Sequence, residues 1–583
     1  MHGAHTIYQN LPALRAGQHR ERLPGWRDLA ALVLVVGLVI LLGGGARQMI
    51  EPAAHAQAVS ISLSPAALPL YTLRTVLRML AALVASLLFT LTYATLAAKS
   101  RRAERVLIPL LDVLQSVPVL GYLSFTVVFF VSLFPGNALG AELAAIFTIF
   151  TSQAWNMAFS FYQSLRMVPS DLDEACRSVR SSPWQRFWRL EVPFAMPGLV
   201  WNTMMSMSGG WFFVVASEAI SVGDVQIALP GVGSYVARAI EERNLACVGW
   251  AIVAMSVAII LYDQLLFRPL VAWSEKFRFE QTAAQLSPRS WVLTLFQQSA
   301  IFQSINRIAA TGLQRVGDAR LLPGFRAPLV RHPPPQRVLD AIWLAAVAGA
   351  IGWLVWSLLH FARDTLSWSD VSQAAGSGLL TLLRVLVVVA LASVVWVPVG
   401  VVVGLRPKLT AAVQPVAQFL AAFPANLLFP LAVYAIVTFH LAPAVWLSPL
   451  MILGTQWYIL FNVIAGASAF PTDLREAAAT FRVRSLHWWW QVILPGIFPY
   501  FVIGAITASG GAWNASVVSE AVNWGSTTLN GGGLGAYITQ MTHAGDYPRI
   551  ALGVAVMSVY VVAMNRLLWR PLYAFAERHV RLD

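Results

Sequence analysis

One polar stretch of the chain occurs twice, at a constant distance of 302 residues. The first copy extends from Pro169 to Pro193, and the second from Pro471 to Pro495; we call them the first loop and the second loop. The same distance separates Asp171 from Asp473, Arg180 from Arg482, Trp188 from Trp490, and Pro197 from Pro499. A fixed distance over this many positions indicates a duplicated unit. The fold must therefore contain the same unit twice.

Most of the remaining chain is apolar. Hydrophobic residues make up 57% of the 583 residues and charged residues only 11%, whereas soluble domains carry about 25% charged residues. Together with a mean hydropathy of +0.65, this composition indicates a polytopic membrane protein. The net charge of +13 would suit a nucleic-acid-binding protein if the chain were soluble. The arginines instead stand beside the apolar runs, which is the positive-inside pattern, so we expect no nucleic acid as a partner.

Apolar runs predict about twelve membrane spans, six in each half of the chain. In the first half they cover residues 29–43, 75–97, 107–134, 143–161, 198–220 and 248–267, and in the second half 339–360, 378–404, 411–439, 444–466, 497–522 and 548–568. Arginine-rich segments between the runs mark the cytoplasmic side. A signal peptide cleaved near Ala54-His55-Ala56 is an alternative for the first run, although its long charged lead favours a span. An even number of spans places both termini in the cytoplasm.

The runs divide the chain into four regions. Residues 1–27 form a cytoplasmic tail, 28–272 a first transmembrane domain, 273–337 a polar cytoplasmic linker, and 338–583 a second transmembrane domain. Both domains enter the membrane in the same orientation, as parallel rather than inverted repeats. The expected fold is an all-α polytopic membrane protein built from two parallel tandem six-helix repeats. The arginine-rich linker is expected to act mainly as a tether, with membrane lipid as a further partner.

Each loop has the sequence of two short helices joined by a bend. Helix caps are expected at Asp171 and Ser182 in the first loop and at Asp473 and Ser485 in the second. Glu174 and Glu476 follow the aspartates at the spacing of a capping box. Pro193 and Pro495 are expected to end the second helix of each loop.

Exposed tryptophans give these loops the character of a docking surface. Trp188 and Trp490 are apolar anchors of the kind that is enriched at interface hot spots. A rigid helix–bend–helix on the inner face would suit a soluble partner protein. The alternative is that Glu174 and Glu476 only cap a helix and that the tryptophans lie among lipid headgroups. Capping alone does not explain two copies that face the same side.

The loops resemble the EAA motif of permeases in binding-protein-dependent ABC importers. Glu476-Ala477-Ala478 followed by Val492-x-Leu494-Pro495 is similar to that motif, and Glu174-Ala175-Cys176 followed by Leu190-x-Val192-Pro193 is similar more loosely. The resemblance implies the type I ABC importer permease fold, and a coupling helix in each loop that docks on an ATPase subunit. It assigns that coupling role to Glu174, Ala175, Arg180, Trp188, Glu476, Ala477, Arg482 and Trp490. Arg180 and Arg482 stand where the family has a glycine, which calls the sharp bend of the loop into question.

Further motifs resemble the nitrate, sulfonate and taurine branch of these permeases. Thr75-x-x-Arg78 is repeated as Thr381-x-x-Arg384, and Gly231-Val232-Gly233 as Gly533-Leu534-Gly535. The resemblance implies a multi-pass protein of the bacterial inner membrane that carries a small anion such as nitrate, sulfonate, taurine or bicarbonate. It also implies two ATPase subunits and an extracytoplasmic solute-binding protein as partners. No P-loop is present, so ATP would be hydrolysed by separate subunits and not by this chain.

Ionisable and glycine residues inside the spans are the candidates for the substrate pathway. They are Arg78, Gly209, Gly210 and Glu218 in the first half, and Arg384, Gly510, Gly511 and Glu520 in the second. Two symmetry-related arginines could present a positive ring to an oxyanion. Alternatively, Arg78 and Arg384 snorkel to the headgroups or pair with Glu218 and Glu520. The glycine pairs could loosen the fifth span of each half or simply allow close helix packing.

Other functions are less compatible with the sequence. A twelve-span secondary transporter is the main alternative, but ion coupling would need acidic or histidine residues in mid-membrane. Glu218 and Glu520 are the only such pair, and both stand near span ends. A membrane-embedded enzyme would need a cluster of His, Asp or Glu at one depth, which the sequence lacks. We therefore expect no catalytic residues, no metal site and no cofactor.

Overall fold

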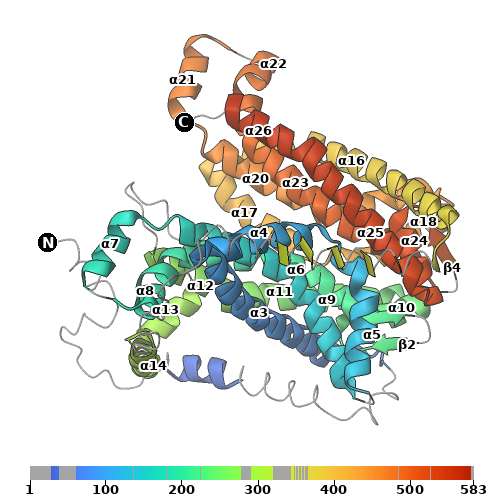
Figure 1. Ribbon diagram of the computed structural model, residues 1–583, viewed down its shortest axis with the longest axis horizontal. Helices are drawn as coiled ribbons and strands as arrows, with labels where there is room; N and C mark the ends of the chain where they lie inside the picture. The colour runs from blue at the N-terminus through green and yellow to red at the C-terminus, as the bar shows by residue number, and fades with distance from the viewer. Residues whose placement is uncertain are drawn as a thin grey trace.

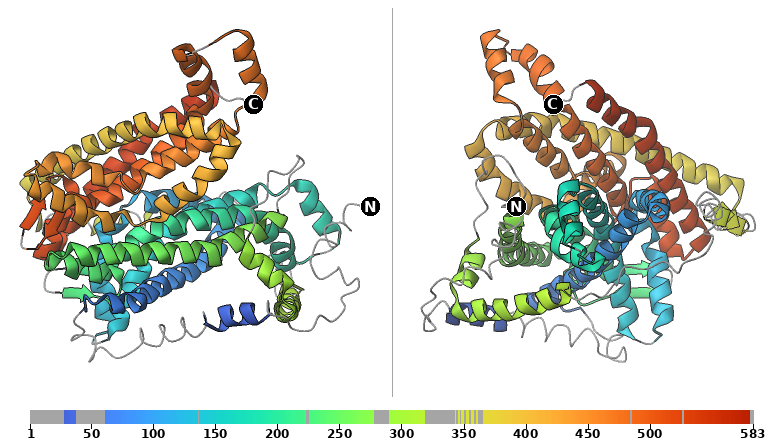
Figure 2. Two further views of the ribbon diagram at one scale, coloured as in Figure 1. Left: turned by 180° about the vertical axis from the view of Figure 1, so that it is seen from behind. Right: turned by 60° about the vertical axis from the view of Figure 1, so that its left-hand side comes forward.

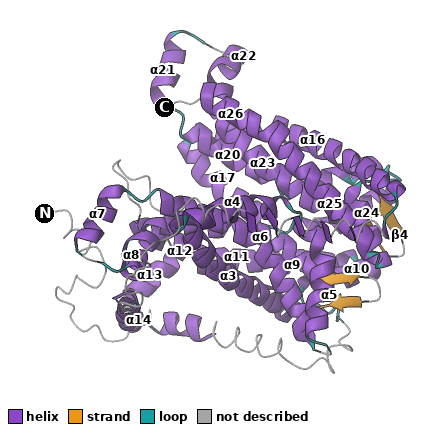
Figure 3. Cartoon of the chain, in the orientation of Figure 1, coloured by secondary structure: helices purple, strands orange, loops and turns teal. Residues whose placement is uncertain are grey.

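The computed structural model describes most of the two transmembrane domains. The described residues are 28–37, 61–135, 137–179, 181–222, 225–277, 290–318, 366–483, 485–525 and 527–579, with single residues between 343 and 365. Helices dominate these parts of the chain, in agreement with the expected all-α fold (Figure 3). They form two bundles that correspond to the two halves of the sequence (Figure 1).

The first half contains the following elements. They are α3 (Leu68–Lys99), α4 (Arg101–Ser116), η3 (Val119–Tyr122), α5 (Leu123–Leu133), α6 (Ala138–Arg166), α7 (Ser170–Ser178), α8 (Pro183–Arg186), η4 (Phe187–Glu191), α9 (Val192–Glu218), β1 (Ala219–Val222), β2 (Val225–Ala228), α10 (Val232–Glu241), α11 (Leu245–Tyr262), η5 (Asp263–Phe267) and α12 (Arg268–Ser274). The linker contributes α13 (Trp291–Gln298) and α14 (Ala300–Asp318).

The second half repeats this order of elements. They are α16 (Trp368–Gly404), α17 (Pro407–Ala422), η7 (Ala425–Leu428), α18 (Phe429–Thr438), α19 (Pro443–Trp446), η8 (Ser448–Met451), α20 (Gln456–Ser468), α21 (Thr472–Thr480), α22 (Ser485–Trp488), η9 (Trp489–Ile493), α23 (Leu494–Ser519), β3 (Ala521–Trp524), β4 (Thr527–Asn530), α24 (Leu534–Ala544), α25 (Tyr547–Met564), η10 (Asn565–Trp569) and α26 (Arg570–His579).

Several of these helices are suited to cross a membrane. Five are long and apolar enough within the described residues, and two bent helix pairs raise the number to seven. The expected third span of the second half is not straight, because α17 and the segment 425–438 meet at 79°. The break follows Pro424, which cannot continue the ladder of helix α17. The expected first spans, 29–43 and 339–360, lie largely outside the described residues.

Two short β-hairpins interrupt the helical pattern. Strand β1 pairs with β2 between Ala219 and Ala228, and β3 pairs with β4 between Ala521 and Asn530. The expected fifth spans therefore end two or three residues earlier than predicted. Each hairpin connects its strands by two residues, Gly-Asp or Gly-Ser in the sequence, which is a recognised hairpin signal. The hairpins are therefore a feature that the apolar runs did not predict.

The broken third spans are exchanged between the halves. Segment η3 packs against α23 and α25 of the second half, and η7 packs against α9 and α11 of the first half. Leu120 and Leu123 accordingly belong to the buried core of the second half, and Leu427 to that of the first. Because each apolar core contains residues of the other half, neither bundle is complete alone.

Prolines within the long helices follow wide turns. Each of η4, η5, η9 and η10 is a five-residue π-helical turn, and each is followed within two residues by a proline. Proline lacks an N–H group and its ring collides with the preceding helical turn, so a widened turn accommodates it without a break. The expectation that Pro193 and Pro495 end a helix is therefore wrong. Both prolines stand near the start of a span, α9 or α23.

The two loops lie at the same end of the molecule. Figures 1 and 2 show α7 and α8 of the first half, and α21 and α22 of the second, at one end of their bundles. Both hairpins lie at the opposite end. We call these the loop end and the hairpin end. Helix α21 lies well away from α7 in each view, whereas the halves touch at the hairpin end, where Gly525 N donates to Ile240 O at 3.0 Å.

Candidate functional site

The first helix of each loop exposes its acidic residue. Glu174 in α7 and Glu476 in α21 are both solvent-exposed, as is Ala175, whereas Ala477 is half-buried. The expected caps at Asp171 and Asp473 are wrong, because the helices begin one residue earlier and place each aspartate second. An acidic side chain in the first turn still interacts favourably with the helix dipole. The glutamates are thus free to meet a partner.

The sharp bend of the loop is preserved without glycine. Arg482 has a left-handed backbone, with φ of 53°. Val483 N donates to Ala478 O at 2.9 Å, the bond that defines a Schellman helix end. Ser181 N donates to Cys176 O in the same way in the first loop, at 3.1 Å. Arg180 itself lies outside the described residues.

The second helix of the loop begins differently in the two copies. Ser182 caps α8 as expected, in a capping box with Gln185. Ser485 is not a cap, because it is the first residue of α22 and has a φ of 55°. In both copies the short helix continues through a π turn into the long span. A push on the loop would therefore be transmitted directly to α9 or α23.

Ion pairs fasten the first loop to its own span. Arg186 contacts Asp173 at 2.9 Å and Glu191 at 3.0 Å, and Lys99 at the end of α3 contacts Glu191 at 2.9 Å. Asp173 also pairs with Arg177, at 2.8 Å. These contacts link helix α7 of the first loop to two spans of its own half.

The second loop has other residues at these positions. At the constant distance of 302 residues, Asp173 corresponds to Arg475, Arg186 to Trp488, and Glu191 to Ile493. The second loop exposes larger apolar side chains: Phe481 is 80% exposed and Trp490 69%, whereas their counterparts in the first loop are the smaller Val179, 69% exposed, and the half-buried Trp188. Exposed aromatic side chains of this size are typical of docking surfaces.

A cavity of about 390 Å³ lies between the halves. Polar residues from both halves line it, among them Asn156, Ser208, Thr455, Tyr458 and Asn514. Aromatic residues complete the wall: Trp155, Phe212, Phe213, Phe423, Trp513 and Trp569. Every lining residue in the described part of the chain is uncharged. A solute in this cavity would meet hydroxyl, amide and aromatic groups rather than a counter-charge.

The glycine pairs stand at this cavity without loosening their helices. Helices α9 and α23 continue unbroken through them. Gly209, Gly510 and Gly511 line the cavity, whereas Gly210 faces Gln153 and Met79. A Cβ on Gly511 would overlap the Thr455 methyl group, so this glycine serves close packing.

Arg78 is fully buried in an ionic cluster. Its Nε and Nη2 donate to the two oxygens of Glu142 at 2.6 and 2.7 Å, and Nη1 donates to Glu218 Oε1 at 2.6 Å. Glu218 also accepts from Thr75 Oγ1 and from Gly233 N, both at 2.7 Å. The cluster joins α3, α6, α9 and the start of α10. Arg78 does not line the cavity, and its contacts are those of the alternative in which it pairs with Glu218.

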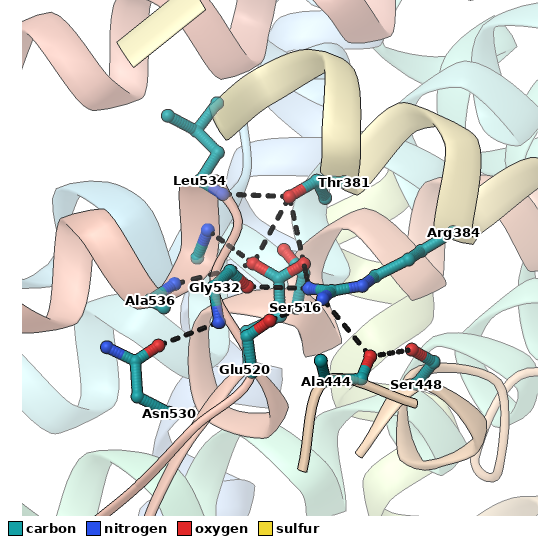
Figure 4. A network of polar contacts seen from close by, with 12 residues as sticks. Thr381, Arg384, Ala444, Ser448, Ser516, Glu520, Asn530, Gly532, Leu534 and Ala536 are labelled. Atoms are coloured by element: carbon teal, nitrogen blue, oxygen red, sulfur yellow. Dashed lines mark hydrogen bonds and ion pairs between the residues drawn. The ribbon is translucent and has the colours of Figure 1, made fainter. Parts of the chain in front are cut away.

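Arg384 occupies the equivalent place with fewer carboxylates (Figure 4). Its Nη1 contacts Glu520 Oε1 at 3.1 Å and Gly532 O at 2.6 Å, and Nη2 donates to Ala444 O at 3.1 Å and to Gly531 O. Ala444 stands at the position that Glu142 occupies in the first half. A main-chain carbonyl thus replaces a carboxylate. Arg384 does not line the cavity either.

Glu142 was not among the predicted site residues. An acidic residue inside an apolar run is costly unless it has a partner, and that signal was available in the sequence. The second half has Ala444 at the corresponding position, so the repeat itself does not point to Glu142. Among the described residues, no group of three His, Cys, Asp or Glu side chains is placed to hold a metal ion.

Comparison with known proteins identifies the domain that is duplicated. The family described as "Binding-protein-dependent transport system inner membrane component" matches residues 86–268 and again 396–579, together more than half of the chain. The expected boundaries of the two transmembrane domains enclose these matches.

Individual relatives are similar to about a third of this chain each. The bicarbonate transport system permease protein CmpB of Synechococcus elongatus is 28% identical over 183 residues, which are 31% of this chain and 60% of CmpB. The nitrate import permease protein NrtB of Leptolyngbya laminosa is 24% identical over 188 residues, 32% of this chain and 63% of NrtB. The glycine betaine/proline betaine permease protein ProW of Escherichia coli is 30% identical over 169 residues, 29% of this chain and 43% of ProW.

These matches cover between 43% and 63% of each relative's length. The double family match, the helical bundles with several membrane spans and the two loops at one end agree with one another. The chain is a multi-pass inner-membrane protein, and it belongs to the family of binding-protein-dependent transport system inner membrane components, with the family domain present twice in one chain.

Proposed function

We propose that this chain is the translocation subunit of an ATP-driven importer, with both halves of the pathway fused. The position of both loops at one end of the molecule carries the proposal, because two equivalent docking sites on one side suit a pair of ATPase subunits. Each loop continues without interruption into a long span. The chain itself is a transport subunit and not an enzyme.

The mechanism follows from that continuity. Two ATPase subunits close on ATP and move the two loops, and each loop carries its span, α9 or α23, with it. The halves then rock about the region where they exchange their broken third spans. This motion opens the cavity alternately toward the loop end and the hairpin end. A solute-binding protein delivers its ligand at the hairpin end.

Orientation and partners complete the proposal. The loop end faces the cytoplasm, and both termini lie on that side. The solute-binding protein is extracytoplasmic, and membrane lipid surrounds the spans. The arginine-rich loops and linker support this orientation, because positive residues are retained on the cytoplasmic side.

A small anion is the solute that we propose. The similarity to permeases named for bicarbonate and nitrate supports it. The uncharged cavity is compatible with a transient anion, which hydroxyl and amide donors hold loosely enough to release. A zwitterion such as a betaine is the second candidate, because a betaine permease is similar too and aromatic walls suit a quaternary ammonium group.

Reconstitution tests the function directly. The chain is placed in liposomes together with the ATPase subunits and binding protein encoded beside it, and uptake of labelled nitrate, bicarbonate, taurine and glycine betaine is measured. We expect uptake that requires ATP and the binding protein. Uptake without an ATPase, driven by a proton or sodium gradient, would instead establish the secondary transporter. Cysteines placed at Glu174 and Glu476 should react only with reagents on the ATPase side.

A further inference from the structure

Arg243 adopts a backbone conformation that favours glycine. It follows α10 with a φ of 53°, and Asn244 N donates across it to Ala239 O at 2.8 Å. The second half makes the same turn, in which Asp546 N donates to Met541 O at 3.0 Å. There the corresponding residue is Gly545, with φ of 68°. The same turn thus uses glycine once and a strained arginine once, and strain of this kind persists only where the surroundings maintain it.

The side chain of Arg243 explains why the first half keeps an arginine. Its Nη2 donates to Thr527 Oγ1 of the second half at 3.4 Å. The Arg243 side chain also packs directly against Gly525 at the β3–β4 turn, where a Cβ on Gly525 would overlap Arg243 Nε. Gly525 has a φ of 58° and donates its N–H to Ile240 O at 3.0 Å. Side-chain and main-chain contacts therefore both join the end of α10 in the first half to the β3–β4 turn of the second half.

Apolar contacts support this junction from beneath. Ile240 and Leu245, on either side of the turn, pack against a buried cluster of the second half that includes Phe429, Leu447 and Trp524. The junction is one-sided, because Gly545 has no side chain with which to repeat it. It lies at the hairpin end, opposite the loops (Figures 1 and 2).

We propose that Arg243 is a positioning residue that latches the two halves together at the hairpin end. The latch keeps the cavity closed to the outside until the halves rock, and it must open in every cycle. This inference rests on the proposed transport function, since the cavity lies between the halves and can open outward only if they separate there. The arginine is retained in a glycine conformation because the latch requires its length and its donors.

Arg243→Gly tests the latch while preserving the turn, because Gly545 shows that glycine suits this position. Arg238→Gln is the matched control: Arg238 is an exposed arginine of the same helix, and its ion pairs are with Glu241 and Glu242 of its own half. The reporter is a cysteine at the cavity residue Ser208, in a chain whose Cys176 and Cys247 are replaced by serine. A membrane-impermeant maleimide is applied from the hairpin side of oriented vesicles.

We expect Arg243→Gly to raise the rate of labelling about twofold to fivefold, the range of an exposed charged contact, while Arg238→Gln leaves it unchanged. Gly525→Ala should raise it too, because its Cβ displaces the arginine. In the Arg243→Gly background the addition of Gly525→Ala should have a smaller effect, since the collision is gone. Equal labelling of Arg243→Gly and the control would overturn the latch.

Basal ATP hydrolysis of the assembled complex gives the second readout. A weakened latch should raise hydrolysis in the absence of binding protein, because less work is needed to separate the halves. If neither the variants nor the unaltered chain stimulated ATP hydrolysis by an ATPase, the proposed function would be wrong. The labelling experiment requires no ATPase, so it would still decide whether Arg243 closes the hairpin end.

Discussion

The two halves of this protein use the same scaffold with different chemistry. At the hairpin end, Thr75 and Thr381 each bind a carboxylate, Glu218 or Glu520, that also accepts a main-chain N–H from the glycine-rich turn. The arginine beside them faces two carboxylates in the first half and one in the second. Duplication therefore preserved the geometry of the cluster but not its charge.

The loops differ in the same sense. The first loop is held by ion pairs to its own half, whereas the second loop lacks the residues that form them and exposes larger aromatic side chains elsewhere. One loop is therefore fixed in position before a partner arrives, whereas the other offers more apolar surface for docking. If ATPase subunits dock on both loops as proposed, this difference predicts that the two loops bind them with unequal affinity.

Removal of the buried arginines should have the largest effect on stability. Arg78→Gln leaves two carboxylates buried without a cation, and breaking a buried pair costs about 3–5 kcal/mol. Arg384→Gln leaves one carboxylate that still accepts from Thr381 and two or more N–H groups, so we expect about 1–3 kcal/mol. Both losses of stability are measured as the fraction of protein that stays monodisperse after heating in detergent, compared with the unaltered chain. An equal loss for the two variants would contradict the difference between the two clusters.

Docking of the ATPase should depend more on the second loop. Trp490→Ala removes an exposed anchor, and we expect the ATPase to bind about 2 kcal/mol more weakly with no change in thermal stability. Glu476→Lys should weaken binding of the ATPase in the same assay. Glu174→Lys in the first loop should weaken it less. Trp188 packs against Trp184 and Phe187, so Trp188→Ala should lower stability instead. Equal affinities for the two tryptophan variants would contradict the asymmetry.

The sequence predicted the features that both halves share. A constant distance of 302 residues located the loops, and apolar runs located most spans, because both patterns are independent of tertiary contacts. The pairs of Arg78 with Glu218 and of Arg384 with Glu520, which the sequence offered as an alternative, are present, and contact of these arginines with the solute stays a prediction. The second partner of Arg78, Glu142, is 64 residues away along the chain, and no local pattern identifies it.

Local details were predicted less well where two rules compete. Pro193 reads as a helix end, but a π turn accommodates it within a helix that tertiary packing supports. Arg482 reads as the loss of a bend, yet a non-glycine residue can adopt the left-handed conformation at modest cost. The exchange of the third spans between the halves is a property of the assembled fold and leaves no trace in the sequence.

Two adjacent glycines, Gly510 and Gly511, both line the cavity, but only Gly511 is closely packed. Gly511→Ala places a methyl group against Thr455, and we expect overpacking to cost about 1–3 kcal/mol. Gly510 has open space around its Cα, so Gly510→Ala should leave the fold intact or stabilise it by up to about 1 kcal/mol. Thermal unfolding distinguishes the two variants. Reduced uptake by a fully stable Gly510→Ala variant would support the cavity as the pathway.

The smallest expected effect concerns the ion pairs of the first loop. Asp173→Asn removes the charge that Arg177 and Arg186 share at the loop surface, and pairs that are partly exposed contribute only about 0.5 kcal/mol each. The loss should fade as salt rises from about 0.05 M to 0.5 M, because screening weakens the native pairs too. Arg475→Ala in the second loop is the control, since Arg475 stands at the position that Asp173 occupies in the first loop. If the variant left ATPase affinity for the first loop unaltered at low salt, the ion pairs would serve stability alone. A measurable fall in this affinity would show that the first loop binds the ATPase more tightly because its ion pairs hold it in place. That property distinguishes the first loop from the second.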